Sequence, residues 1–312
     1  MFLLNALKNK FLVPKTQILD KSEMWFLSCP EDELERRSHL GPEVLSALMS
    51  LRTNGYAVLK KNIPHSVCDA LISDFNAYCS GNEEAKKYTD EYGLRSRLAL
   101  FHYVSDNAMK VATAPKTVNV LKAAFKNEFN IVGSLFFEKG STQDVHRDTP
   151  AFFTNPLNHF FGVWNALEDI QPGTGELCYF RGGHKVIRDQ NLYDDYGINI
   201  NNYFSAVKEA CLNAGLQLET FTPEKGDTLI WLPELPHGGS PRNNPAASRR
   251  SMVFHYIPRG IPIHGVNEFF DSNKPIFTKE NYGVRVKNGV RLIDMGEVRF
   301  YHNHKEGNFE EG

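Results

Sequence analysis

Cysteines are few in this sequence, and long apolar runs are absent. The cysteines are scattered and form no Cys-x-x-Cys pair, which argues against a zinc site or a disulfide framework; they are Cys29, Cys68, Cys79, Cys178 and Cys211. No stretch approaches the ~20 apolar residues that a membrane-spanning helix needs. The run MFLLNALKNK is too short and too charged for the core of a signal peptide. We therefore expect a soluble, cytoplasmic protein without a membrane span.

An excess of charge of one sign is also missing. The 35 basic and 37 acidic residues are mixed along the chain, and the formal net charge is -2. No basic stripe is therefore available to release counterions from a nucleic acid. The length of 312 residues, the 41% hydrophobic content and the 22 phenylalanines suffice for one sizeable core. We expect a small molecule, not a nucleic acid, as the partner; both a monomer and a homodimer fit the sequence.

Helical patterns come before strand patterns along the chain. Residues 1–40 are charged and weakly periodic, which is typical of an N-terminal arm. Apolar spacing, bounded by prolines and glycines, then predicts helices at about 42–54, 64–80 and 115–126, and a strand at 56–59. We expect these helices to flank the β-rich part of the chain that follows.

From residue 129 the pattern changes to short β-rich runs separated by Gly, Pro, Asn and Asp. The runs are IVGSLFFE, FFGVWNAL, ELCYF, LQLETFT, DTLIWLP and SMVFHYI, with one helix expected at about 203–213. This order predicts a mainly β protein with flanking helices, of the α+β class, whose working part is a barrel or sandwich. We place one domain at 41–312, with the β core at about 129–257 and a C-terminal extension at 258–312.

Two side chains of metal-ligand type lie two positions apart in His146-Arg147-Asp148. Residues i and i+2 of an extended segment project to one face, so this imidazole and carboxylate can reach one ion. His237 follows far downstream, where a strand-like run ends in the turn PELPHGGS. Two histidines and one carboxylate leave three adjacent positions open on iron(II), which is the ligand set of non-haem oxygenases. The alternative is that His237 only caps a loop.

A strand-like segment after His237 opens with two arginines, Arg249 and Arg250. Alternation allows only one of them to face inward. Arg249 shares its parity with Ser251, so an inward Arg249 offers a guanidinium fork and a hydroxyl to a carboxylate, such as the C5 carboxylate of 2-oxoglutarate. Arg250 would then point to solvent. In the alternative reading, both arginines are surface charges.

With these residues in hand, the chain resembles the phytanoyl-CoA dioxygenase-like family of iron and 2-oxoglutarate oxygenases, over about residues 45–257. The resemblance rests on HRD, on the distal histidine and arginine, and on three longer segments: GYAVLKKNIP, GVWNALEDIQPGTGELCYFRGGHK and EKGDTLIWLPELPHGGS. Several ordered motifs at family-like distances are more specific than any one of them.

The resemblance implies a double-stranded β-helix, a cupin-like jelly roll. It implies that His146, Asp148 and His237 bind iron(II), that Arg249 anchors 2-oxoglutarate, and that Trp164 forms a wall of the co-substrate pocket. Oxygen is then the second co-substrate, succinate and CO2 are products, and ascorbate is a candidate reductant. Oxidation of a C–H bond of a small molecule is expected, with hydroxylation as the default and cyclisation or desaturation as further outcomes.

One departure from the family pattern is visible. Relatives often carry Ser two residues after the distal histidine, whereas this chain has Gly239 there and Ser240 next. The partners of the co-substrate carboxylate are therefore open. Two other classes of protein also remain open: a catalytically silent jelly-roll protein that binds a metal or ligand, and a cupin-like metal-dependent isomerase or hydrolase, which has no need of Arg249.

Several polar residues outside the triad have both a functional and a bland interpretation. His184 can touch substrate or be satisfied by backbone in a turn, and His255, which shares the parity of Arg249, can be a core residue. Three arginines can pair with an anionic group of the substrate or be solvated surface charges, which we favour: Arg95, Arg97 and Arg181.

Overall fold

The protein is described by a computed structural model over residues 12–14, 19–186, 200–271 and 273–301. Its helices are α3 (Trp25–Ser28), α4 (Glu31–Glu35), α5 (Pro42–Asn54), α6 (His65–Cys79), α7 (Glu83–Lys87), α8 (Asp106–Ala112), α9 (Pro115–Phe125), α11 (Ile200–Asn213) and α12 (Val266–Phe270), with the 3-10 turns η1 (Ser38–Leu40), η2 (Phe101–Tyr103) and η3 (Gly183–Lys185). Among these helices, none has both the length and the apolar character needed to cross a bilayer.

The strands are mostly short and cluster in the second half of the chain. They are β1 (Leu12–Pro14), β2 (Tyr56–Leu59), β3 (Arg97–Ala99), β4 (Phe129–Phe137), β5 (Phe153–Thr154), β6 (Phe161–Ala166), β7 (Leu177–Phe180), β8 (Leu218–Phe221), β9 (Thr228–Trp231), β10 (His237–Gly239), β11 (Ser251–Pro258), β12 (Ile263–His264), β13 (Pro275–Phe277), β14 (Val284–Lys287), β15 (Val290–Ile293) and β16 (Arg299–Tyr301).

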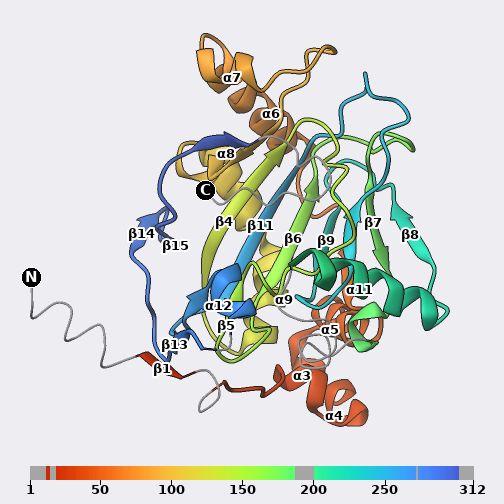
Figure 1. Cartoon of the computed structure of the whole chain (residues 1–312), viewed down its shortest axis with the longest axis vertical. Helices are drawn as coiled ribbons and strands as arrows, with labels where there is room; N and C mark the ends of the chain where they lie inside the picture. The colour runs from red at the N-terminus through yellow and green to blue at the C-terminus, as the bar shows by residue number, and fades with distance from the viewer. Residues whose placement is uncertain (1–11, 15–18, 187–199, 272, 302–312) are drawn as a thin grey trace, which may run out of the picture.

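A large mixed sheet dominates the fold (Figure 1). Its strand order is β14-β15-β4-β11-β6-β9-β2, and β3 joins β16 to the same sheet beside β4. The central strands pair antiparallel, whereas β15 runs parallel to β4. A smaller sheet has the order β10-β7-β8. The α+β class predicted from the sequence is confirmed.

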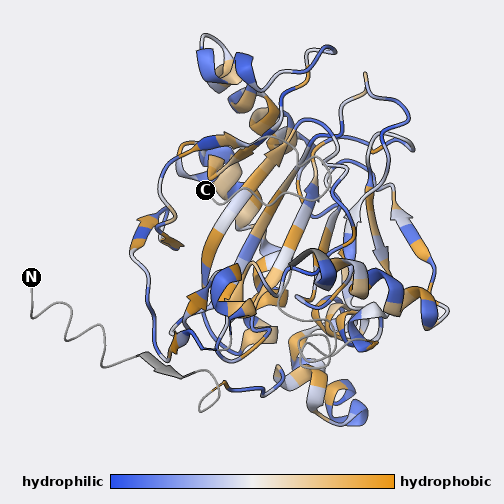
Figure 2. Ribbon diagram, viewed as in Figure 1, coloured by the Kyte–Doolittle hydropathy of each residue, from blue (hydrophilic) through white to orange (hydrophobic). Residues whose placement is uncertain are grey.

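The two faces of the large sheet are buried by different partners. On one face, residues such as Phe136, Phe254 and Ile230 join a core with side chains from α5, α6, α8 and α9. On the other face, Trp164 and Val253 pack with residues of β7 in the smaller sheet. Strand alternation therefore divides the protein into a helix side and a sheet side. Figure 2 shows hydrophobic residues along β4, and hydrophilic ones over much of the outlying α7.

The predicted elements are present close to their expected bounds. The predicted helices appear as α5, α6, α9 and α11, and the β-rich runs as β4, β6, β7, β8, β9 and β11. Within the predicted arm, Phe26 and Leu34 are fully buried in the helix-side core. Parts of that arm and of the C-terminal extension lie outside the described residues, and the domain boundaries stay a prediction.

The helix-side core generates a stability prediction. Phe136 is fully buried and stacks on Phe75, with ring centroids 4.1 Å apart and an angle of 14° between the planes. Phe136→Ala removes this contact and leaves a cavity, so the free energy of unfolding in urea should fall by about 3–5 kcal/mol. The control Val286→Ala, at a side chain 69% exposed in β14, should change it by less than ~0.5 kcal/mol. A loss below ~1 kcal/mol at Phe136 would contradict this packing.

Candidate metal and co-substrate site

Two backbone hydrogen bonds join the first and third predicted metal ligands. The His146 N–H donates to the His237 carbonyl at 2.8 Å, and the His237 N–H donates to the His146 carbonyl at 2.9 Å. His237 begins β10, whereas His146 lies outside the named strands and pairs through this isolated bridge. The bridge places the two imidazoles side by side, with centroids 4.5 Å apart.

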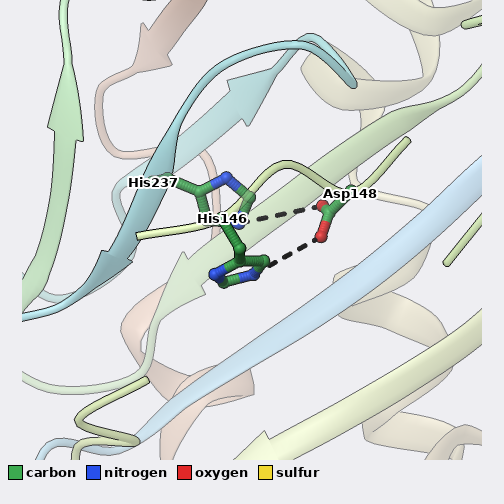
Figure 3. A group of neighbouring side chains, drawn as sticks. All are labelled: His146, Asp148 and His237. Atoms are coloured by element: carbon green, nitrogen blue, oxygen red, sulfur yellow. Dashed lines mark ion pairs between the residues drawn. The ribbon is translucent and has the colours of Figure 1, made fainter. Parts of the chain in front are cut away.

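Both imidazoles turn the same nitrogen toward Asp148. Nδ1 of His146 lies 2.7 Å from the Asp144 carbonyl, and Nδ1 of His237 lies 2.9 Å from the Leu235 carbonyl. A carbonyl only accepts, so each Nδ1 carries the proton and each Nε2 has a free lone pair. The Nε2 atoms lie 3.7 Å and 3.8 Å from the Asp148 carboxylate oxygens (Figure 3).

The spacing and charge of these three side chains fit a metal ion. Their candidate ligand atoms all lie within 4.8 Å of one another. The distances of 3.7 Å and 3.8 Å from the two Nε2 atoms to the Asp148 carboxylate are shorter than twice a metal–ligand bond of about 2.1 Å. Burial and the neighbouring His237 lower the pKa of His146 to about 4. Burial alone would raise the pKa of Asp148, but His237, His255 and His146 outweigh it and hold that pKa below its usual range. Neutral imidazole and an ionised carboxylate are the forms that bind metal.

Two residues that the sequence did not single out as ligand supports hold the Asp148 carboxylate. The Trp231 Nε1–H donates to Asp148 Oδ2 at 2.9 Å, and His255 Nε2 lies 3.3 Å from the same oxygen. Phe152 stacks on the His255 ring at 4.0 Å. His255 is thus a residue of the site and not only a core residue. Its sequence position, an even number of residues after Arg249, already indicated that both side chains face the same way.

The Trp231 indole depends on a glycine in the neighbouring strand. Gly162 of β6 lies opposite Trp231 of β9 in the antiparallel register. A Cβ atom at Gly162 would lie 2.1 Å from the indole, closer than real Cβ contacts come. The glycine therefore leaves the space in which Trp231 reaches Asp148.

Arg249 lies inward and is 3% exposed. Its Nε–H donates to the Gly175 carbonyl at 3.0 Å and its Nη1–H to Ser251 Oγ at 2.6 Å. The guanidinium carbon lies 5.2 Å from the ring centroid of Phe137 and 5.7 Å from that of Trp164. No carboxylate of the described chain comes within ion-pair distance of Arg249, and burial lowers its pKa to about 10. A buried guanidinium in this setting fits a bound anion, such as the carboxylate of a keto acid.

The expectation that Arg250 points to solvent is wrong. Its guanidinium pairs with Glu168 at 3.0 Å and with Glu138 at 3.2 Å, and its N–H donates to Glu168 at 2.6 Å. The Glu138 carbonyl in turn accepts from the Arg249 N–H at 2.9 Å. Arg250 thus links the residues just before β11 to two carboxylates, those of Glu138 and Glu168.

The departure from the family pattern at Gly239 has a steric reason. A Cβ atom there would lie 2.9 Å from both Ser141 Oγ and the Thr142 nitrogen. Ser240 is buried, and its N–H donates to the Glu176 carbonyl at 2.8 Å. Residues 141–142 therefore occupy the space that a serine at position 239 would need.

The predicted site residues other than Ser251 line one cavity of about 200 Å³. Its walls come from β3, β4, β6, β9 and β11 of the large sheet, from β7 and β10 of the small sheet, and from α11 and α12. Its lining includes His146, Asp148, Trp164, Trp231, His237, Arg249 and His255. Ser251 lies behind Arg249 as its hydrogen-bond acceptor and is fully buried.

Three other residues weighed in the sequence have structural partners. His184 Nε2 lies 3.2 Å from the Arg52 carbonyl, whereas its buried Nδ1 has no hydrogen-bond partner among the described residues; burial lowers the pKa of His184 to about 4. Arg95 pairs with Glu138 at 3.2 Å, and Arg181 pairs with Glu219 at 2.8 Å.

Solved structures share this fold. The carbocyclase SnoK from nogalamycin biosynthesis, titled non-heme and alpha-ketoglutarate-dependent, is 13% identical, with a TM-score of 0.56 over 75% of this chain and 95% of its own. The epimerase SnoN from the same biosynthesis is 14% identical, with a TM-score of 0.56 over 85% of this chain and 99% of its own. A further SnoN structure is titled as a complex with Fe3+, alpha ketoglutarate and nogalamycin RO. At these identities the likeness shows the fold alone.

The sequence itself matches a known family. No curated protein sequence matches the chain, but the model of the family described as phytanoyl-CoA dioxygenase (PhyH) matches residues 51–251, which is more than half of it. The match covers His146, Asp148 and His237, whose ligand atoms the structure gathers. The chain therefore belongs to the phytanoyl-CoA dioxygenase family, and it is an iron(II)- and 2-oxoglutarate-dependent dioxygenase.

Proposed function

We propose that this enzyme oxidises an unactivated C–H bond of a small molecule, with hydroxylation as the default outcome and succinate and CO2 as co-products. One observation carries the proposal. A triad of metal-ligand type and a buried arginine without a carboxylate partner in the described chain open on the same cavity. The first element suits a ferrous ion and the second suits the far carboxylate of 2-oxoglutarate.

Each site residue has a proposed part in this chemistry. His146, Asp148 and His237 hold the iron, Arg249 grips the co-substrate with Ser251 orienting it, and Trp164 forms a wall. When bound, iron with 2-oxoglutarate and oxygen supplies the oxidising power for C–H cleavage.

The protein's own contribution is orientation and exclusion of water. Trp231 and His255 fix the Asp148 carboxylate through their contacts to its Oδ2 atom. Arg249 is held from behind by the Gly175 carbonyl and the Ser251 hydroxyl. A pre-oriented guanidinium loses little freedom when a carboxylate arrives. The apolar side chains around the triad keep solvent from the reacting atoms.

The detailed fold of the core, the cellular compartment and the reductant are also proposals. The two facing sheets support a double-stranded β-helix as the core. The cysteines Cys29, Cys68, Cys79, Cys178 and Cys211 are all free, which supports a reducing, cytoplasmic setting. Ascorbate as reductant stays a prediction, which its addition to the assay tests.

The competing classes explain less of the site. A silent binder or a cupin-like isomerase needs the metal ligands but gives no role to a buried Arg249. The outcome of C–H cleavage is a separate matter, because neighbours of this fold are titled a carbocyclase and an epimerase. One fold thus hosts several reactions, so cyclisation and desaturation are the alternatives to hydroxylation at this site.

Succinate release tests the proposal. Wild-type protein given iron(II), 2-oxoglutarate and oxygen should release succinate, faster with a true substrate from a metabolite panel. Arg249→Gln removes charge-assisted hydrogen bonds of about 1.5–3 kcal/mol, so the KM for 2-oxoglutarate should rise at least ~10-fold. His146→Ala should abolish turnover.

The matched control is Arg181→Gln, at a surface ion pair whose arginine side chain is 55% exposed. It should leave the KM for 2-oxoglutarate unchanged. Unaltered turnover in the His146 variant, or an unaltered KM in the Arg249 variant, would remove that residue from the site.

Trp231 should tighten metal binding by holding Asp148. Trp231→Phe keeps the aromatic ring but removes the N–H that donates to Asp148 at 2.9 Å. Loss of such an outer contact typically weakens metal affinity by about 10–100-fold. We expect that rise in the dissociation constant of cobalt(II), measured by equilibrium dialysis.

Trp25→Phe is the control, since it removes an indole N–H that donates to the Ala123 carbonyl, also at 2.9 Å, away from the site. It should leave cobalt affinity unchanged. Equal cobalt affinity in wild type and Trp231→Phe would show that the indole does not support the ligand.

A further inference from the structure

Arg97 brings a second inward-facing positive charge to the cavity. It begins β3, whose next residue, Leu98, lies opposite Phe136 in the helix-side core. Side chains alternate along a strand, so Arg97 projects to the opposite face, the sheet side that carries the site. Arg97 indeed lines the same cavity as the metal triad.

The other charged residues of the lining belong to the proposed site or extend toward another element. Asp148 is the one acidic side chain in the lining that the structure describes, and it belongs to the triad. Arg249 faces the co-substrate in the proposed function. Arg147 lies between the two ligands in sequence and donates to the Tyr203 hydroxyl at 3.4 Å, toward α11. Arg97 is therefore a cationic residue of the lining that the proposed binding of iron and 2-oxoglutarate does not use.

The surroundings of Arg97 strengthen its attraction for an anion. The guanidinium carbon lies 5.7 Å from the ring centroid of Tyr301, and burial lowers the pKa of Arg97. Arginine stays protonated in proteins even so. In a partly desolvated cavity, a fixed cation attracts an anion more strongly than it does in water.

We propose that Arg97 binds an anionic group of the substrate, a carboxylate or a phosphate. The inference rests on the proposed function and adds the chemical class of the substrate: an acid whose apolar part lies against Phe152, Phe204 and Val266 in the same lining. The anion would set the distance between the guanidinium and the triad, and so decide which C–H bond is presented. Carboxylate and phosphate share the geometry that a guanidinium fork recognises.

Calorimetry with simple anions tests this inference without knowledge of the substrate. Protein loaded with nickel(II) and 2-oxoglutarate is titrated with inorganic phosphate and, separately, with acetate. At least one of them should bind, and the tighter one identifies the source of the anion. Arg97→Gln should weaken that binding about 10-fold or more. Arg97→Lys, which keeps the charge, should weaken it less.

The matched control is Arg285→Gln. Arg285 also lies over a tyrosine, with 4.8 Å between its guanidinium carbon and the Tyr103 ring centroid, but its side chain is 47% exposed. Its loss should leave anion binding unchanged. Arg97→Met, which keeps the apolar stem, is the second neutral variant if Arg97→Gln fails to fold.

Binding of neither anion to wild type, or equal binding in both neutral variants, would overturn the inference. Loading with 2-oxoglutarate is measured separately by equilibrium dialysis. Failed loading together with anion binding lost in Arg97→Gln would sink the proposed function but keep an anion site at Arg97. Normal loading with 2-oxoglutarate but no binding of phosphate or acetate would keep the proposed function and overturn the anion site at Arg97.

Discussion

The pair of backbone hydrogen bonds between His146 and His237 is the constraint on which the site depends. These bonds join a short extended segment to the start of β10, and β10 is itself fixed by antiparallel pairing with β7. The two imidazoles therefore arrive together as a property of the backbone. Each Nδ1 is then occupied by a carbonyl two residues earlier in the chain, which aims Nε2 at the ion position. A shift of either segment would separate the ligands even if both sheets kept their arrangement.

Alternation along β11 supplies the second half of the site. Ser251, Val253 and His255 face the cavity side, with Arg249 just before them, whereas Met252 and Phe254 join the helix-side core. β11 and the residues just before it thus contribute the proposed co-substrate anchor, its hydroxyl partner and a support for Asp148. Because Met252 and Phe254 are fully buried on the other face, the strand cannot slip by one residue without exposing them.

Much of this arrangement was predictable from short patterns. The triad followed from residue type and spacing, and Arg249 from parity, since both depend only on local periodicity. Trp231 and Gly162 could not be found in this way, because their partnership comes from the register between β6 and β9, which no local pattern specifies. Arg250 was wrongly assigned to solvent because two distant carboxylates, Glu138 and Glu168, meet it only in the folded chain.

Diffraction from crystals grown without oxygen in iron(II) and 2-oxoglutarate would test the central claim most directly. The account predicts one metal ion about 2.0–2.2 Å from Nε2 of His146, Nε2 of His237 and one Asp148 oxygen, with the co-substrate's C5 carboxylate on Arg249. A metal bound elsewhere, or a keto acid whose far carboxylate avoids Arg249, would contradict it.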